Sequence, residues 1–349
     1  MITTRRTAIA LASTAVLGLA ACSSDAGSSG SASGATKAAT LKLGYFANFT
    51  HAPAIVGLQD GLFQKRLGAT KLSSSVFNAG PAATEALLSG AIDAAFIGPG
   101  PTTNAYVQSK AITVIAGAAA NGAALVVKPS ITSAAQLRGK KLATPQLANT
   151  QDIALRFWLK EQGLTTTATG GGDVSIAPQS NGDAVNAFKQ GQIDGGWLPE
   201  PYATQLVQAG GTVLVDEKTL WPGQRFVTTN LVVKTDYLQR YPTTVSDLLT
   251  GLIAAEKAIA DDPAAAQTKT NAGIAQITGT PIDAGVLKTA WSHVVFTVDP
   301  IASSLITGAA HAKAVGLLTG STADLKKIYD LKPLNALLKA DGRAAVQGA

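Results

Sequence analysis

The chain has one cysteine, one methionine and three histidines in 349 residues, and only 14% of its positions are charged. One thiol excludes an internal disulfide framework and a multi-cysteine zinc site, so the fold must depend on buried apolar surface. The formal net charge of +6 is spread along the chain without a block of Lys or Arg, which argues against nucleic acid as a partner. Gly-x-Ser-x-Gly, His-Glu-x-x-His and phosphate-loop motifs are missing too, so we expect neither a metal nor a cofactor.

Residues 1–21 have the composition of an export signal. Arg5 and Arg6 precede an apolar run from Ala8 to Ala21, which at about 14 residues is shorter than the roughly 20 that a membrane-spanning helix needs. The basic pair fits a twin-arginine signal and the positive start of any other export signal equally well. The sequence therefore predicts a secreted chain without choosing the export route.

Leu19-Ala20-Ala21-Cys22 resembles the bacterial lipobox. The resemblance implies that Cys22 carries a lipid and begins the mature protein, on the extracellular face of the cytoplasmic membrane. A free cysteine beside an ordinary cleavage site is the alternative. Residues 22–40 are mostly Ser, Gly and Ala, a composition that behaves as a flexible tether.

One structural pattern occurs twice in the remaining chain. Gly90-Ala91-Ile92-Asp93-Ala94-Ala95-Phe96-Ile97 corresponds to Gly191-Gln192-Ile193-Asp194-Gly195-Gly196-Trp197-Leu198. In each copy a helix-period stretch ends at a glycine suited to a left-handed C-cap and is followed by a short apolar strand and a Pro-containing loop. We interpret Asp93 and Asp194 as turn-capping residues rather than paired catalytic acids.

The pattern predicts two doubly wound α/β lobes joined by two crossing strands. A strand, loop and helix at 41–65 are repeated at 141–162, and apolar segments at 123–127 and 226–233 bracket the second lobe. From 242 onward the periodicity is helical and predicts five helices that return to the first lobe. We therefore assign 41–127 plus 225–349 to lobe one and 128–224 to lobe two.

Several segments, in this order and spacing, resemble the type II periplasmic binding proteins, specifically the substrate-binding components of ABC importers for sulfonates, taurine and nitrate. They are Gly61-Leu62-Phe63, Glu85 to Asp93, Leu137 to Ala143, Trp197 to Tyr202 and Ile328 to Leu331, and the match covers most of residues 41–340. The resemblance implies a monomer that captures a small anion or zwitterion, closes its lobes and delivers the solute to a membrane permease with its ATPase.

Loops that follow strands are the expected ligand contacts, because open α/β sheets hold ligands at the carboxyl ends of their strands. Free N–H groups at helix N-termini suit an oxyanion. The candidates are Asn48, Phe49, Thr50 and His51 in the first loop, Gly100, Thr102 and Thr103 in the second, and Gln146, Asn149 and Thr150 in lobe two. Each also has an ordinary structural interpretation as a cap, a turn or a packed side chain.

Trp197 and Glu200 lie where the second copy of the repeated strand ends, and we expect both at the cleft. A buried carboxylate needs a partner, either a ligand ammonium or Arg225. Glu200 facing the ligand favours a zwitterion such as taurine, whereas a structural ion pair at this loop is the alternative.

The best-supported interpretation is a lipid-anchored solute receptor for an aliphatic sulfonate or taurine. A receptor for nitrate, bicarbonate or a thiamine-type pyrimidine, a sensory module that presents its ligand to a kinase, and a secreted enzyme using Glu200 and His51 are the alternatives.

Overall fold

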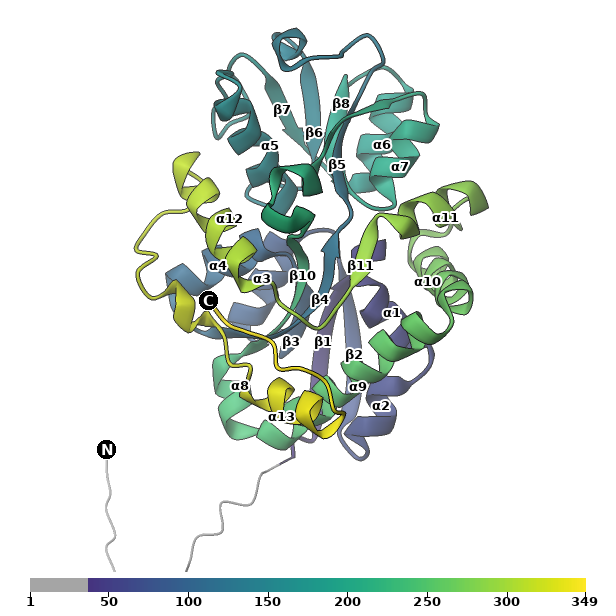
Figure 1. The fold of residues 1–349 in the computed structure, drawn as a ribbon, viewed down its shortest axis with the longest axis vertical. Helices are drawn as coiled ribbons and strands as arrows, with labels where there is room; N and C mark the ends of the chain where they lie inside the picture. Colours follow the sequence, from purple (N-terminus) through teal and green to yellow (C-terminus); the bar gives the residue numbers. More distant parts are fainter. Residues whose placement is uncertain (1–36) are drawn as a thin grey trace, which may run out of the picture. The chain divides into compact units, whose positions relative to one another are not determined.

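The computed structural model describes residues 37–349, so the predicted signal, Cys22 and most of the tether lie outside the described residues. Within 37–349, no helix is long and apolar enough to cross a bilayer. Two separate sheets organise this part of the chain (Figure 1).

The first sheet has six strands in the order β11-β4-β10-β3-β1-β2. Strands β1, β2 and β3 run parallel, and β10 pairs antiparallel with both β3 and β4. The strands are β1 (Thr40–Phe46), β2 (Lys71–Phe77), β3 (Ala94–Ile97), β4 (Ile112–Asn121), β10 (Val227–Lys234) and β11 (Val294–Phe296).

The second sheet has five strands in the order β7-β6-β8-β5-β9. Here β7, β6 and β8 are parallel, and β5 pairs antiparallel with β8 and β9. The strands are β5 (Ala123–Val127), β6 (Lys141–Thr144), β7 (Ser175–Pro178), β8 (Gly195–Pro199) and β9 (Thr212–Asp216). The α/β class with two lobes is thus confirmed.

The two sheets share one topology. In each sheet, three parallel strands have as their neighbour a strand that the chain reaches after crossing from the other lobe. This strand is β10 in the first sheet and β5 in the second. The first crossing lies at Asn121 and Gly122, both with positive φ, and the second passes through residues 217–226. Because β5 pairs entirely within the second sheet, the crossing precedes residue 123 rather than following 127 as we predicted.

Helices cover both faces of each sheet. Lobe one has α1 (Ala52–Gln59), α2 (Leu62–Leu67), α3 (Gly80–Ser89) and α4 (Pro99–Ser109), and lobe two has α5 (Thr150–Glu161), α6 (Asn181–Lys189) and α7 (Tyr202–Gln208). The expected single helix at 53–65 is broken at Gly61, whose φ of 63° is left-handed. Short 3-10 turns lie at Phe49–His51, Ala134–Leu137, Glu217–Leu220, Pro222–Gln224 and Leu325–Ile328.

The C-terminal part is helical as predicted, with one added strand, β11. Its helices are α8 (Thr235–Arg240), α9 (Pro242–Asp261), α10 (Pro263–Thr278), α11 (Ala284–Ser292), α12 (Ala302–Ala314) and α13 (Lys332–Ala340). Helices α9 and α10 pack on α1, whereas α12 lies beside α4 of lobe one and also contacts α5 of lobe two (Figure 1). Not all of this segment therefore packs on lobe one alone.

The repeated aspartates have the same role in both lobes. Asp93 accepts the Lys42 N–H through its carboxylate (2.9 Å) and donates its own N–H to the Lys42 carbonyl (2.9 Å). Asp194 makes the same pair of bonds with Lys141, at 2.9 and 2.7 Å. Each aspartate thus ties the start of its strand to the neighbouring parallel strand, which makes the sequence repeat a structural one.

We expect Asp194→Ala to lower the free energy of unfolding by about 1–2 kcal/mol, because it leaves the Lys141 N–H without its acceptor and removes the 2.8 Å ion pair with Lys128. Asp236→Ala is the matched control: Asp236 is 54% exposed and pairs only with surface cations, so the change should be within about 0.5 kcal/mol. Urea denaturation of both variants measures the difference. An equal decrease in the free energy of unfolding for both variants would contradict the proposed role of Asp194.

Candidate functional site: a charge-free cavity between the lobes

A small cavity lies between the lobes at the carboxyl ends of the parallel strands, where α/β sheets hold their ligands. We call it the head cavity. Its lining residues come from loops of both sheets: Phe46, Asn48, Thr50, His51, Asn78, Ala79, Gly98, Pro145, Asn149, Thr150, Gln151, Asn181, Pro199 and Thr228. Both lobes and one crossing strand, β10, thus contribute to its wall.

Four helices begin at the head cavity. Ala79, Gly98 and Asn149 are the N-cap residues of α3, α4 and α5, and Asn181 is the first residue of α6. First-turn N–H groups have no acceptor within their own helix, and the helix dipole adds a partial positive charge at this end. Two helix N-termini from each lobe therefore place donors and positive potential at one point.

The lobes are in contact around the head cavity. The Gly80 N–H of lobe one donates to Oδ1 of Asn149 in lobe two (3.3 Å), and the Gly100 N–H donates to Oγ1 of Thr150 (3.3 Å). The enclosed volume is about 20 Å³, roughly enough for one water molecule. Binding a larger solute requires the lobes to separate slightly from this closed arrangement.

His51 presents a neutral donor to the head cavity. The Phe46 N–H donates to His51 Nδ1 (3.2 Å), so the neutral ring carries its proton on Nε2. Burial lowers the pKa of His51 to about 3, and its ring stacks on Phe46 at 4.3 Å. Nε2 has no hydrogen-bond partner in residues 37–349, which leaves this N–H for a ligand.

Amides and hydroxyls supply the other polar groups. Thr50 donates to Oδ1 of Asn48 (2.8 Å), which orients the Asn48 amide. Asn181 is 8% exposed, and its side-chain oxygen has no hydrogen-bond partner within the described chain. A buried polar atom of this kind costs free energy unless something binds it. Asn181 Oδ1 is therefore an unsatisfied acceptor in the wall of the head cavity, and it suits a donor rather than an anion.

Among residues 37–349, no Asp, Glu, Lys or Arg lines the head cavity. Asp152 lies just behind it in the first turn of α5, where a free carboxylate would repel an anion. Its charge is balanced by buried Arg156 at 3.0 Å, and it also accepts from Thr144 (2.9 Å) and from the Ala148 N–H (2.9 Å). The local potential is thus set by neutral donors and helix ends.

The structure brings five predicted residues together at the head cavity and places the others elsewhere. Asn48, Thr50, His51, Asn149 and Thr150 line it. Phe49 is buried against Trp291 in the lobe-one core, and Arg225 is exposed on the second crossing. The Thr102 and Thr103 hydroxyls also differ from expectation, because they donate to the carbonyls of Gly98 and Pro99 at the start of α4. Gly100 lines a neighbouring cavity, and Gln146 lies outside the lining of the head cavity.

Trp197 differs most from our expectation. It is fully buried in the lobe-two core, its ring packs edge-on against Trp158, and its Nε1–H donates to Glu217 (2.6 Å). Successive strand residues face opposite sides of a sheet, and the side chain of Trp197 points into the lobe-two core. It does not contact the head cavity.

Glu200 forms a structural contact between the lobes. Its carboxylate, 3% exposed, accepts from Nδ1 of His293 in lobe one (2.6 Å) and from the hydroxyl (2.9 Å) and N–H (3.1 Å) of Thr204. Its backbone carbonyl accepts the Phe49 N–H (3.0 Å). The partner is therefore His293 rather than Arg225 or a ligand ammonium.

The remaining lining residues have weaker signals in the sequence. Asn78 and Asn181 occupy corresponding turns of the two lobes, a correspondence visible in the sequence that turn formation alone also explains. Gln151 follows the predicted Thr150, and Thr228 lies in the predicted crossing strand. Within residues 37–349 no cluster of His, Cys, Asp or Glu is arranged to hold a metal.

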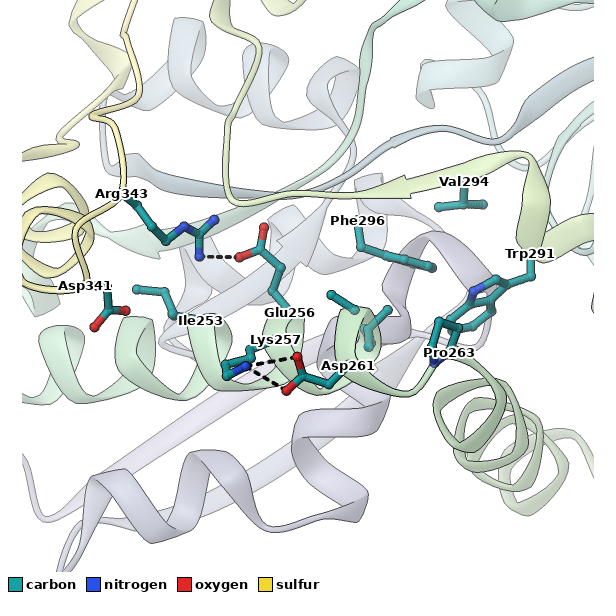
Figure 2. A pocket seen from close by; sticks show the side chains of 12 residues that line it. Ile253, Glu256, Lys257, Asp261, Pro263, Trp291, Val294, Phe296, Asp341 and Arg343 are labelled. Atoms are coloured by element: carbon teal, nitrogen blue, oxygen red, sulfur yellow. Dashed lines mark hydrogen bonds and ion pairs between the residues drawn. The ribbon is translucent and has the colours of Figure 1, made fainter.

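A larger cavity of about 780 Å³ lies on lobe one, between α9, β11 and the chain end (Figure 2). Four of its five charged groups form ion pairs, Glu256 with Arg343 (2.7 Å) and Lys257 with Asp261 (2.8 Å), and Asp341 is the fifth. Only lobe one contributes to its wall, so a ligand there would not connect the lobes. We place the functional site at the head cavity for this reason.

The two sheets with exchanged crossing strands define the two-lobed fold of periplasmic binding proteins. The alkanesulfonate-binding protein of Xanthomonas axonopodis pv. citri superposes with a TM-score of 0.69 at 21% identity, covering 82% of this chain and 96% of that one. The nitrate-binding protein of Synechocystis PCC 6803 gives 0.71 at 18% identity, covering 86% and 89%.

The chain belongs to the NMT1-like family, whose pattern matches residues 34–275. The taurine-binding periplasmic protein of Escherichia coli (strain K12) is 29% identical over 60% of this chain and 64% of its own length. The putative aliphatic sulfonates-binding protein of the same organism is 30% identical over 44% and 48%. The aligned region thus spans less than two thirds of either relative.

The Glu200–His293 pair predicts a pH-dependent stability. The hydrogen bond to Glu200 raises the pKa of His293 above its ordinary 6.5, with a further increase from Asp216 and an opposing effect of Lys218. The stabilisation is complete below pH 6.5 and is lost as the pH rises through the raised pKa. Glu200→Gln should therefore lower the melting temperature more at pH 5.5 than at pH 9.

His311→Gln is the control for this measurement. Burial lowers the pKa of His311, so its contribution has the opposite sign and diminishes as the pH falls below 6.5. Thermal unfolding at both pH values compares the two variants. A Glu200→Gln effect that is the same at both would show that the pair does not stabilise the protein through the charge of His293.

Proposed function

We propose that this protein is the extracytoplasmic solute-binding component of an ABC importer, and that it captures an aliphatic sulfonate between its lobes. The lipid anchor on Cys22, the monomeric state and the permease with its ATPase belong to the same proposal. It is a receptor rather than an enzyme, in keeping with the binding-protein relatives.

The observation that carries the proposal is the convergence of four helix N-termini and the neutral donor His51 on a cavity that no charged side chain of residues 37–349 lines. Such a site stabilises an oxyanion by hydrogen bonds and helix dipoles. A sulfonate stays ionised throughout the physiological pH range, and it has three acceptor oxygens for donors arriving from both lobes.

The same cavity disfavours the ammonium group of taurine. Glu200, the counter-ion that we considered from the sequence, is committed to His293 and Thr204 and lies outside the lining. An ammonium without an anionic partner would lose hydration without compensation. We therefore favour a sulfonate without an amine over taurine, although one relative is named for taurine. Nitrate is the second candidate, because it is a more compact anion than a sulfonate and needs less separation of the lobes.

Closure follows from the position of the site. A ligand that accepts from His51 in lobe one and from Gln151 in lobe two connects the lobes only when they are together. Binding then shifts the population toward the closed arrangement about the two crossings.

Replacing the lining donors tests the site. His51→Ala or Gln151→Ala should each weaken methanesulfonate binding about tenfold, because each removes a hydrogen-bond donor from the cavity wall. Gln146→Ala is the control, since Gln146 lies on a neighbouring loop outside the lining. Isothermal titration calorimetry measures the dissociation constants. Unchanged affinity in both lining variants would show that the anion binds elsewhere.

The pH dependence separates the role of His51 from that of a cationic histidine. Because burial lowers the pKa of His51 to about 3, its ring stays neutral from pH 5 to 8 and donates from Nε2 throughout. The contribution of His51, measured as the ratio of wild-type to His51→Ala affinity, should be constant over this range. A ratio that rises on acidification would indicate an imidazolium instead.

Gly98→Ala tests closure. A Cβ at Gly98 would lie 2.4 Å from Oγ1 of Thr150 across the lobe interface, so this hydroxyl would have to shift from the position in which it accepts the Gly100 N–H. We expect weaker ligand binding with little change in the free energy of unfolding of the ligand-free protein. Gly182→Ala is the control because a Cβ there meets nothing within 4 Å. Calorimetric titration of both variants should show a loss of ligand affinity only for Gly98→Ala.

A further inference from the structure

Two of the four helices that begin at the head cavity carry an acidic residue at the same position. Asp152 is the third residue of α5 and Asp183 is the third residue of α6, whereas the first turns of α3 and α4 contain no acid. One helical turn rises about 5.4 Å, so both aspartates lie within one turn of the cavity wall. A negative charge at this position opposes the binding of an anion that the helix N-termini attract.

The two aspartates differ in their exposure to water. Asp183 is exposed, and its carboxylate accepts a hydrogen bond from the hydroxyl of Ser180 (2.6 Å). Water therefore screens the charge of Asp183. Asp152 is 0% exposed, so solvent does not screen its carboxylate. Without a counter-ion, the charge of Asp152 would act strongly on a ligand in the head cavity.

The carboxylate of Asp152 holds a loop that forms part of the cavity wall. Oδ1 accepts from the hydroxyl of Thr144 (2.9 Å), and Oδ2 accepts from the Ala148 N–H (2.9 Å). Ala148 has a φ of 61°, a left-handed conformation that a residue with a Cβ rarely adopts. It lies in the sequence between Pro145 and Asn149, which both line the head cavity. Asp152 thus has a structural role at this loop, and its charge accompanies that role.

Arg156 supplies the compensating positive charge from the next turn of α5. Its side chain is 2% exposed, its Nε–H donates to Oδ2 of Asp152 (3.0 Å), and its Nη1 donates to the Thr167 carbonyl. The pair with Asp152 is the one ion pair that Arg156 forms within residues 37–349. Arg156 is not among the residues that line the head cavity, so it acts on a bound ligand without touching it.

We propose that Arg156 determines the specificity of the site for an anion, by cancelling the buried negative charge that Asp152 places behind the head cavity. Asp152 fixes the loop, and Arg156 allows the N-terminus of α5 to attract an anion in spite of that acid. Arg156 is therefore a positioning residue that acts through Asp152. The inference rests on the function proposed above and deepens it, because it names the residue that sets the sign of the ligand charge.

The test separates the charge of Arg156 from its structural contacts. Arg156→Gln should weaken methanesulfonate binding about tenfold at pH 8, because it leaves a buried negative charge uncompensated. Adding Asp152→Asn to this variant removes that charge and should restore the affinity to within about threefold of the wild type. Both variants lack the contacts of Arg156, so a purely structural role would leave the double variant at least as weak. Isothermal titration calorimetry measures the three dissociation constants.

Two further substitutions are matched controls. Arg156→Lys retains a positive charge and should bind methanesulfonate within about threefold of the wild-type affinity. Asp183→Asn removes an exposed carboxylate from the same position of α6, and it should change the affinity less than about twofold because water already screens that charge. Circular dichroism and thermal unfolding establish that each variant is folded.

A second comparison applies if Arg156→Gln does not fold. Asp152→Asn alone retains the positive charge of Arg156, which the double variant lacks, and both have the same change at residue 152. The single variant should therefore bind methanesulfonate at least about threefold more tightly than the double variant. Equal affinities of these two variants would overturn the inference.

The outcomes distinguish this inference from the proposed function. Recovery of affinity in the double variant supports the role of Arg156. If Arg156→Gln binds methanesulfonate as tightly as the wild type, or if the double variant binds as weakly as Arg156→Gln, this inference is overturned while the sulfonate receptor stands. If the wild-type protein binds no sulfonate, the proposed function fails and this inference fails with it.

Discussion

The position of the binding site depends on one topological constraint: each sheet places the carboxyl ends of three parallel strands toward the other lobe. Helices α3 and α4 of lobe one and α5 and α6 of lobe two begin at those ends, so their N-termini meet at the head cavity. Aligned backbone dipoles then supply positive potential at the head cavity, although no Lys or Arg is among the described residues that line it. Neutral amides, hydroxyls and the Nε2–H of His51 complete a site suited to an anion.

The same topology couples the site to lobe movement. At the crossings, Asn121 donates its N–H to the Phe226 carbonyl (3.0 Å) and its side-chain amide to the Gln224 carbonyl (3.2 Å), so the two connections are tied together. On either side of the cavity, Glu200 pairs with His293, and His311 of α12 stacks on Phe157 of α5 at 3.7 Å. These contacts hold the lobes together around the cavity, and a bound anion adds to them.

Local signals predicted most of the fold. Gly90 and Gly191, followed by Asp93 and Asp194, mark the same helix-to-strand turn in each lobe, and the loops after β1 and β6 contain five residues that line the head cavity. Features that depend on distant pairing were not predictable. The apolar sequence of β5 is compatible with a hinge strand, and only its pairing with β8 and β9 places it in lobe two. The sequence does not indicate which face of β8 Trp197 occupies. His293 lies far from Glu200 in the sequence, so their contact was not predictable.

A crystal structure of the protein with methanesulfonate tests the central claim most directly, namely that an anion is held between the lobes by neutral donors. We predict sulfonate oxygens within hydrogen-bonding distance of His51 Nε2, of the Gln151 side-chain amide and of the first-turn N–H groups of α5. A sulfonate paired with an Arg or Lys side chain, or one bound in the lobe-one cavity beside Arg343, would contradict the account.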